Sequence, residues 1–502
     1  MKQSTWYQKI FGGYRRTLLI SAIFFLPLVF LNIRHDHDWG GDFAQYMAQA
    51  DNIAHLRPMS ATAYVYNEAY PSLAPKAYPP GFPLLIAPIA FIYDNYIPPY
   101  LIFISLLLML TALMSVFLLK QRIGLIAAIS LSIVIYYNPV IVSFKSEIMA
   151  DIPFALLFIV FLLFTVVTHK EISIKRWIWA GIVAGLASVT KTAGYCLLLA
   201  MLAYATQLAI IEVTGKKKLA FRERQFLAPL SGFASGLFVL LLFSLVFSGS
   251  GEGSVSYLNS FDFKGLLETI QINVFNYSEA LRGFFSGQNT PHQWFGALTG
   301  SAILTFFITG FIMAVFRKPG IMEWVIVSYL GLLFVYPYHH SGFRFLIPVA
   351  PVILFYAAYA VHSLKPGRGG VVLAVIIAFM MVWDYFPRLK EIHKSSSFIQ
   401  EGPYKDIVIN AFGKIKLLTP ENALIVFNKP TVLAKYTGRK SLALKPLSSE
   451  KELTSQINHF KPDYLLKYRG LPDQSLDLLL FSRSNEYELI YNDSDFWLYQ
   501  RR

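Results

Sequence analysis

Side chains able to do acid–base or metal chemistry gather near the start of the sequence, in and just before the stretch DHDWGGDFAQY (36–46). They are His35, Asp36, His37, Asp38 and Asp42. A carboxylate held in place can remove a proton from a bound hydroxyl group. Two histidines beside carboxylates can also ligate a divalent metal, although no third clear ligand accompanies them. The stretch is therefore a candidate for part of a catalytic site.

Asp42 is the aspartate that the neighbouring pattern singles out. It follows two glycines and stands before FAQYMAQADNIAHL (43–56), in which apolar residues recur at helical spacing and the glutamines fall on other faces. The pattern predicts an amphipathic helix lying on a membrane surface, with Asp42 as its N-cap. Asp42 is interpreted either as a cap alone or as a cap that also acts as a base. The two earlier aspartates are interpreted as acidic loop residues.

The composition is that of a polytopic membrane protein. Hydrophobic residues make up 55% of the 502 positions and charged residues 15%, against about 25% charged residues in a soluble domain. Apolar runs near the ~20 residues that cross a bilayer recur along the chain. These runs are 17–33, 100–119, 124–142, 150–168, 177–190, 193–213, 226–247, 296–315, 322–338, 345–363 and 370–387. The single cysteine, Cys196, excludes an internal disulfide.

The basic residues predict the orientation of these runs. If each run crosses the membrane, the Lys- and Arg-containing loops all fall on the same side as the basic N-terminus, which is the cytoplasmic side. The loops 34–99 and 248–294 and the C-terminus then lie outside. Membrane topology thus accounts for the net charge of +14, and no nucleic-acid partner is expected.

The segment after residue 387 changes character, because charge rises and apolar runs shorten. It predicts strands at 423–427, 463–468, 487–491 and 496–500 and helices at 430–438 and 448–460, the second with a Ser/Glu capping start. We therefore expect a transmembrane domain, 1–387, of about eleven helices, and a small extracytoplasmic α/β domain, 388–502.

A proline-rich segment, PKAYPPGFPLLIAP (75–88), closes the first outer loop. Its prolines rule out a simple helix before about Pro83 and favour a rigid re-entry into the membrane. Lys76 either meets a phosphate at the level of the lipid headgroups or only extends to the membrane surface.

Five motifs occur in a characteristic order along the chain. They are GGDFAQYMAQADNIA (40–54), YPPGFPLLIAP (78–88), SEIMADIPFALLFI (146–159), SVTKTAGYCLLL (188–199) and HSGFRFLIPVAPVILFYAA (340–358). In type and order they resemble the GT-C class of polytopic glycosyltransferases that use polyprenyl-phosphate sugars. The resemblance is greatest to the bacterial relatives of protein O-mannosyltransferases and lipid A aminoarabinose transferases. It implies a GT-C-like fold in a bacterial inner membrane, with the active site on the periplasmic side.

The resemblance also implies roles for individual residues. An acidic residue of the first outer loop acts on the acceptor in this family, and Asp42 matches its position. Arg344, in GFRFLIP, matches an arginine that binds the lipid phosphate, a task suited to its planar fork of donors. Lys76 and Tyr78 are further candidates for binding substrate or phosphate. In the aminoarabinose transferases a lysine directly precedes the Pro-Pro pair, whereas here Ala77 and Tyr78 intervene.

Two further acidic residues and a histidine complete the candidates. Glu147 and Asp151 are four residues apart at the start of an apolar run, a spacing that predicts one helical face. They are interpreted either as boundary residues or as carboxylates facing the active-site cavity, as the family often has there. His340, beside Arg344, is a candidate for binding phosphate or, with an acidic partner, a metal. A divalent metal ion is the one cofactor left open.

The sequence thus predicts an inverting glycosyltransferase that moves a monosaccharide from a polyprenyl-phosphate carrier to an acceptor hydroxyl on a protein, lipid or glycan. The alternatives are a transporter or flippase, or an O-antigen-type polymerase or ligase for lipid-linked sugars. A transporter places ionisable residues within its spans, and these spans are nearly free of charge. A polymerase of that type relies on a long late loop, whereas this chain concentrates its acidic residues in the first.

Overall fold

The computed structural model describes residues 6–166, 173–214, 225–247, 263–285, 293–317, 319–337, 339–364 and 368–502. The chain divides into two compact units. The first unit comprises Met1–Ile33, Leu101–Val246 and Phe261–Ser396, and the second comprises Arg34–Tyr100, Phe247–Ser260 and Ser397–Arg502. The predicted first outer loop thus belongs to the same unit as the C-terminal segment. Whether 388–502 is a separate domain stays a prediction.

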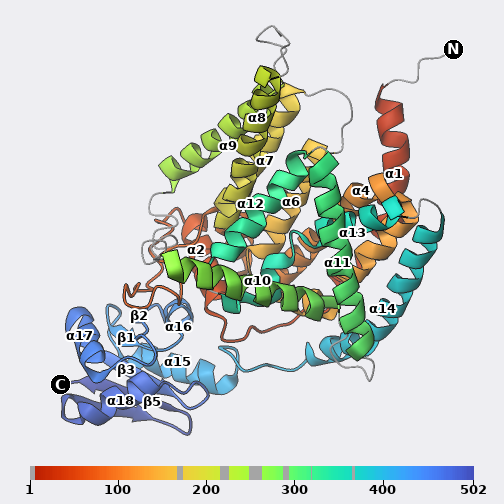
Figure 1. Cartoon of the computed structure of the whole chain (residues 1–502). Helices are drawn as coiled ribbons and strands as arrows, with labels where there is room; N and C mark the ends of the chain where they lie inside the picture. The colour runs from red at the N-terminus through yellow and green to blue at the C-terminus, as the bar shows by residue number, and fades with distance from the viewer. Residues whose placement is uncertain are drawn as a thin grey trace, which may run out of the picture. The chain divides into compact units, whose positions relative to one another are not determined.

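The first unit is helical (Figure 1). Its elements are α1 (Trp6–Phe25), η1 (Leu26–Val29), α4 (Pro98–Tyr136), α5 (Pro139–Phe144), α6 (Asp151–Val166), α7 (Ile174–Thr190), η2 (Thr192–Gly194), α8 (Tyr195–Thr214), α9 (Leu227–Val246), α10 (Phe263–Phe285), α11 (Gln293–Arg317), α12 (Ile321–Val335), η5 (His339–Leu346), α13 (Ala350–Leu364) and α14 (Arg368–Ser395). The mostly helical fold predicted from the apolar runs is confirmed, since every run overlaps a helix.

Four helical segments among the described residues are long and apolar enough to cross a membrane. They are Pro98–Gln121, Thr192–Thr214, Leu227–Val246 and Ala297–Arg317. Two predicted runs share the single helix α4, which is kinked at Gly124, where φ is 75°. The number of spans and their orientation stay predictions.

The second unit contains a five-stranded sheet in the order β2-β1-β3-β5-β4 (Figure 1). The strands are β1 (Leu424–Val426), β2 (Lys440–Leu442), β3 (Tyr464–Tyr468), β4 (Tyr487–Asn492) and β5 (Phe496–Arg501). The first three pair in parallel, and β5 runs antiparallel to both β3 and β4. The helices of this unit are α2 (Gly41–Ala54), α3 (Gly81–Tyr93), α15 (Asp406–Leu418), α16 (Pro430–Thr437), α17 (Glu450–Phe460) and α18 (Gln474–Ser482).

The predicted α/β pattern at the C-terminus is confirmed. All four predicted strands and both predicted helices are present, and α17 begins with a capping box between Ser449 and Glu452. The short strand β2 was not predicted. Its free edge is covered by the first loop, because Val65 N donates to Ser441 O at 2.8 Å and Ser441 N to Ala63 O at 3.0 Å. The first loop therefore extends the C-terminal sheet.

Two predictions about α2 are wrong. Its N-cap is Gly40, which makes no side-chain capping bond, and Asp42 lies one residue inside the first turn. The reason is local, since Asp38 Oδ1 accepts a bond from Gly40 N at 2.7 Å and sets the start of the helix. The helix also lacks a solvated polar face, because Gln45 and Gln49 are as buried as its apolar residues.

Candidate active-site residues

Asp42 is held by Tyr78 within the second unit. The Tyr78 hydroxyl donates to Asp42 Oδ1 at 2.6 Å. The Tyr78 ring stacks on Tyr46 of α2 with centroids 4.3 Å apart, and its backbone N and O both bond the Gln49 amide at 3.1 Å. Asp42 is half-buried in the first turn of α2, where the helix dipole favours a negative charge. The arrangement is a fixed, partly accessible carboxylate.

Tyr78 therefore contacts the candidate base directly. From the sequence it was a candidate only for substrate or phosphate binding, and that role stays a prediction. Lys76 has an exposed side chain, and its backbone O accepts a bond from Gln45 Nε2 at 3.1 Å. Its role in phosphate binding also stays a prediction.

C-terminal residues fix the start of α2. Thr431 Oγ1, on α16, donates to Gly41 O at 2.9 Å. A Cβ at Gly41 would lie 3.0 Å from the same hydroxyl, so the contact leaves little room for a side chain. Trp39 packs edge-on against Phe412 and Phe427, and its indole N–H donates to Glu401 Oε1 at 3.3 Å. The C-terminal part of the unit thus positions the segment that carries Asp42.

Glu401 is the acceptor that binds the Trp39 side chain to the C-terminal part of the unit. Burial acts to raise its pKa, but hydrogen bonds from Lys405, Tyr468 and Trp39 outweigh burial and hold the pKa below the usual value. The Tyr468 hydroxyl lies 2.5 Å from Glu401 Oε1. Glu401 is therefore the charged acceptor of three donors around the Trp39 side chain.

The other polar residues of the first stretch have structural partners. Asp36 is buried and pairs with Arg34 at 2.8 Å, and it accepts a bond from Gln400 N at 2.5 Å. The His37 ring stacks on Phe43 at 3.6 Å, and its Nδ1 lies 3.1 Å from Asp38 Oδ1. Burial acts to raise the pKa of Asp38, but the bond and charge of His37 lower it overall.

Asp151 has a cationic partner within the first unit. It is the first residue of α6, it is buried, and it forms an ion pair with Lys191. Lys191 ends α7 in extended conformation, and η2 follows it immediately. A Cβ at Gly194, in η2, would lie 2.4 Å from the backbone of α7, so only glycine allows this tight break. The break between α7 and α8 thus presents Lys191 to Asp151.

Two cations contact the same aromatic ring. Lys191 Nζ lies 4.5 Å and Arg344 Cζ 5.0 Å from the centroid of the Phe345 ring. Arg344 Nη1 also lies 3.4 Å from Met149 Sδ, in the turn before α6. We call Asp151, Lys191, Arg344 and Phe345 the cation cluster. It combines two predicted site residues, Asp151 and Arg344, with two that were not predicted, Lys191 and Phe345.

Helix α10, in the predicted outer loop 248–294, supports this cluster. The two N–H groups of its buried Asn273 amide are shared among three carbonyl oxygens at the end of α12, those of Leu333, Phe334 and Tyr336, at 3.2, 2.9 and 2.6 Å from Nδ2. Phe284 of α10 stacks on Phe343 at 3.8 Å, beside Arg344. Gly342 has a φ of 61°, which glycine adopts without strain. These contacts fix η5 and the backbone of Arg344.

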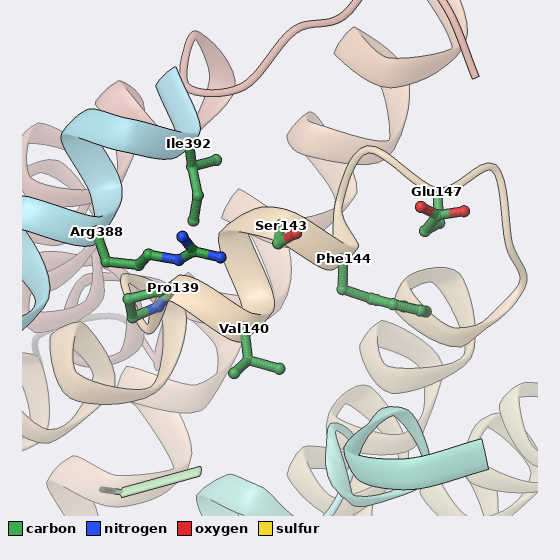
Figure 2. Close-up of a pocket in the computed structure, with 7 residues that line it drawn as sticks. All are labelled: Pro139, Val140, Ser143, Phe144, Glu147, Arg388 and Ile392. Atoms are coloured by element: carbon green, nitrogen blue, oxygen red, sulfur yellow. The ribbon is translucent and has the colours of Figure 1, made fainter. Parts of the chain in front are cut away.

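Glu147 does not share a helical face with Asp151, so that prediction is wrong. Helix α6 begins only at Asp151, and Glu147 lies in the preceding turn. Lys145 anchors this turn, since it is fully buried and donates to Ser105 Oγ at 2.7 Å. Glu147 lines a separate cavity of about 330 Å³ with residues of α5 and α14 (Figure 2). The side chain of His340 lies outside the described part of the chain.

Lys191 could have been found from the sequence. It is the charged residue between the apolar runs 177–190 and 193–213, inside the motif SVTKTAG. Its ion pair with Asp151 joins positions 40 residues apart, which spacing alone does not predict.

Comparison with known proteins indicates the class of protein to which the chain is similar. Residues 77–246, about a third of the chain, match the family described as dolichyl-phosphate-mannose-protein mannosyltransferase. A search of curated proteins gave no match. The resemblance to glycosyltransferases with polyprenyl-phosphate donors, predicted from the sequence, is confirmed.

Solved structures share the fold. The oligosaccharyltransferase of Archaeoglobus fulgidus in complex with Zn and sulfate has a TM-score of 0.57 and 13% identity, covering 97% of this chain and 73% of that one. The same organism's AglB, in complex with an inhibitory peptide and a dolichol-phosphate, has a TM-score of 0.54 and 14% identity, covering 92% and 70%. ArnT from Cupriavidus metallidurans bound to undecaprenyl phosphate aligns over 97% of this chain and 98% of that one, with 14% identity and a TM-score of 0.43.

The fold assignment depends on the archaeal structures, which have the higher TM-scores. This chain has the fold of a polytopic glycosyltransferase of the GT-C class. Together with the family match, the fold indicates a membrane-bound glycosyltransferase.

Proposed function

We propose that the protein transfers a monosaccharide from a polyprenyl phosphate to an acceptor hydroxyl on a protein, lipid or glycan. The observation that carries this proposal is the cation cluster, in which Lys191 and Arg344 both contact the ring of Phe345. The phosphodiester of the donor carries one negative charge, and a second charge develops as the sugar leaves, so two cations suit this group. Arg344 can bind the phosphate oxygens through two parallel bonds. The known complex of AglB with a dolichol-phosphate supports a lipid phosphate as the ligand.

Asp151 balances the charge of the cluster in the absence of a ligand. Its carboxylate neutralises Lys191 while no phosphate is bound, which reduces the cost of keeping a cation in this half-buried place. A phosphate that enters the cluster adds a second anion beside the same ammonium group. The charge that develops on the departing phosphate is then stabilised by Lys191 and Arg344.

Asp42 is the proposed base. Its carboxylate accepts the proton of the acceptor hydroxyl, the hydroxyl oxygen attacks the anomeric carbon, and the bond from that carbon to the phosphate oxygen breaks. The polyprenyl phosphate leaves with the bonding electrons, and a single displacement inverts the anomeric centre. Tyr78 orients the carboxylate through its 2.6 Å bond to Oδ1. No step in this proposal runs through a metal.

The proposed location follows from the charge pattern. The N-terminus and the basic loops lie in the cytoplasm, about eleven spans cross a bacterial inner membrane, and the C-terminal unit lies outside. The donor then enters the cation cluster laterally from the lipid, with its phosphate at headgroup level.

The proposal is tested by reconstituting the protein in nanodiscs with a panel of polyprenyl-phosphate monosaccharides and measuring release of polyprenyl phosphate by mass spectrometry. We expect release from at least one donor, with a large loss in Arg344→Ala. Arg317→Ala is the matched control, since this arginine stacks on Tyr359 away from the cluster. Release from no donor, or full activity in Arg344→Ala, would contradict the proposal. Movement of intact lipid-linked sugar without its consumption would indicate a flippase.

A further inference from the structure

A cavity beside the cation cluster has no role in the function proposed so far. It measures about 330 Å³ and lies between α5, the turn after α5, and α14. This volume is within the range of about 300–1,000 Å³ found for small-molecule sites. Seven residues line it, namely Pro139, Val140, Ser143, Phe144, Glu147, Arg388 and Ile392. None of the seven belongs to the cation cluster, so the cavity is a separate site.

The walls of the cavity are fixed before any ligand binds. Asn138 caps α5 by accepting a bond from Val140 N at 2.9 Å. The Asn138 amide also donates to Phe284 O at 2.6 Å and to the Tyr385 hydroxyl of α14 at 3.1 Å. Lys145 anchors the other end of α5. The elements that carry the lining residues are therefore joined by buried hydrogen bonds, which favours a preformed site.

The lining combines apolar surface with a few polar groups. Figure 2 shows Arg388 reaching from α14 toward α5, with Glu147 on the turn beyond Phe144. Val140, Phe144 and Ile392 supply apolar surface, and Ser143, Glu147 and Arg388 supply acceptors and donors. A pyranose ring presents apolar C–H faces and a rim of hydroxyl groups, which matches such a lining. A carboxylate accepts from hydroxyls and a guanidinium donates to them.

The charges disfavour an anionic ligand. Arg388 already pairs with Glu391 at 2.6 Å, and Glu147 adds a carboxylate to the lining. A phosphate would therefore gain little electrostatic attraction in this cavity. In the cation cluster, by contrast, it would meet two cations on Phe345. The cavity therefore suits a neutral, hydroxyl-rich ligand.

We propose that this cavity binds a neutral sugar ring of a glycan acceptor, an inference that depends on the proposed glycosyltransferase function. The turn 145–150 connects the cavity to the donor site, because Glu147 lines the cavity while Met149 contacts Arg344 at 3.4 Å. An inverting displacement needs the acceptor on the side of the sugar opposite the leaving phosphate, so acceptor and phosphate require separate sites. The cavity supplies the acceptor site, and the turn 145–150 contacts both this site and the phosphate site.

The test uses the full protein in nanodiscs and saturation-transfer NMR. The probes are methyl α-mannopyranoside, methyl β-glucopyranoside, methyl N-acetyl-β-glucosaminide and, for a protein acceptor, N-acetylthreonine amide. We expect saturation of at least one glycoside. Ser143→Trp, which fills the cavity from an exposed position, should abolish it. Arg388→Ala should weaken it about tenfold or more, as expected for loss of a charged donor. Lys390→Ala, an exposed cation on the same helix that does not line the cavity, should leave it unchanged.

Three results would overturn the proposal. These are binding of no glycoside by the wild-type protein, binding of the threonine probe alone, and unchanged glycoside binding in both Ser143→Trp and Arg388→Ala. Release of polyprenyl phosphate, measured separately, tests the proposed function by itself. A protein that consumes donor but binds no glycoside would therefore refute only the acceptor site.

Discussion

Replacing Asn67 tests whether the first loop and the C-terminal segment form one folded unit. Asn67 is 2% exposed, and its amide donates to Ala443 O and to Gln456 Oε1, both at 2.8 Å. Its own oxygen accepts a bond from Ala69 N at 3.0 Å. These partners in the C-terminal segment are 376 and 389 positions away in sequence. The side chain thus joins two distant parts of the chain through buried bonds.

In Asn67→Ala, the three bonds are lost. Each net hydrogen bond contributes about 1 kcal/mol, and each acceptor left buried without a partner costs about 1–3 kcal/mol. Gln456 Oε1 keeps a bond from Lys445 N, so the main orphaned group is Ala443 O. Two lost bonds at about 1 kcal/mol each and one orphaned acceptor at about 1–3 kcal/mol should lower the free energy of unfolding of the second unit by about 3–5 kcal/mol, a large part of the stability of a typical domain.

The assay is hydrogen exchange of the protein in nanodiscs, read at the amides of 63–65 and 440–442. Both segments should exchange faster together in Asn67→Ala, because they pair with each other. Asn492→Ala, at an exposed position on β4, is the matched control. Exchange in Asn67→Ala equal to that of the control, or faster exchange in only one of the two segments, would refute a single cooperative unit.

Three further predictions concern the candidate site. Tyr78→Phe removes a hydrogen bond to a carboxylate and should slow sugar transfer about 10- to 100-fold at unchanged donor affinity, measured by single-turnover kinetics. Lys191→Met leaves Asp151 buried without its partner and should lower stability by about 3–5 kcal/mol. In the double variant Lys191→Met/Asp151→Asn, thermal unfolding should show restored stability, but undecaprenyl phosphate should still not bind. Recovery of binding in this double variant would contradict the role of Lys191 in phosphate binding. The pKa of Glu401 is lower in the folded state than in the unfolded state. The Glu401 carboxylate therefore stabilises the fold fully above the unfolded-state pKa of about 4.3. This stabilisation is lost as the pH falls through the lower folded-state pKa. Glu401→Gln should flatten this acid dependence in urea titrations at several pH values.

Features decided by neighbouring residues were predictable from the sequence. The capping box of Ser449 and Glu452 uses residues three positions apart, and α17 was predicted with its start. The apolar runs predicted most helices of the first unit because length and composition alone favour them, but α10 lies in the predicted loop 248–294 and was missed. The N-cap of α2 was missed although it is local, since Asp38 bonds Gly40 and moves the helix start ahead of Asp42.

Features decided by distant partners were not predictable. Strand β2 has three residues and depends on pairing with β1 and with the first loop. Gln45 and Gln49 are polar yet buried, because the backbone of 75–78 supplies their partners. Lys191 gains its position from the break at Gly194 and its partner from α6. The resemblance to the GT-C class suggested Asp42, Arg344 and Asp151 as site residues, but only the structure shows which side chains hold them.

The role of Asp42 is tested most directly by comparing wild-type protein and Asp42→Asn in a single turnover of a polyprenyl-phosphate sugar. The substitution keeps the size of the side chain and an acceptor for Tyr78, but it removes the basic carboxylate. We expect unchanged donor affinity and a fall in the rate of sugar transfer of about 100-fold or more. Transfer at the wild-type rate by Asp42→Asn would contradict the central claim that this carboxylate accepts the acceptor's proton.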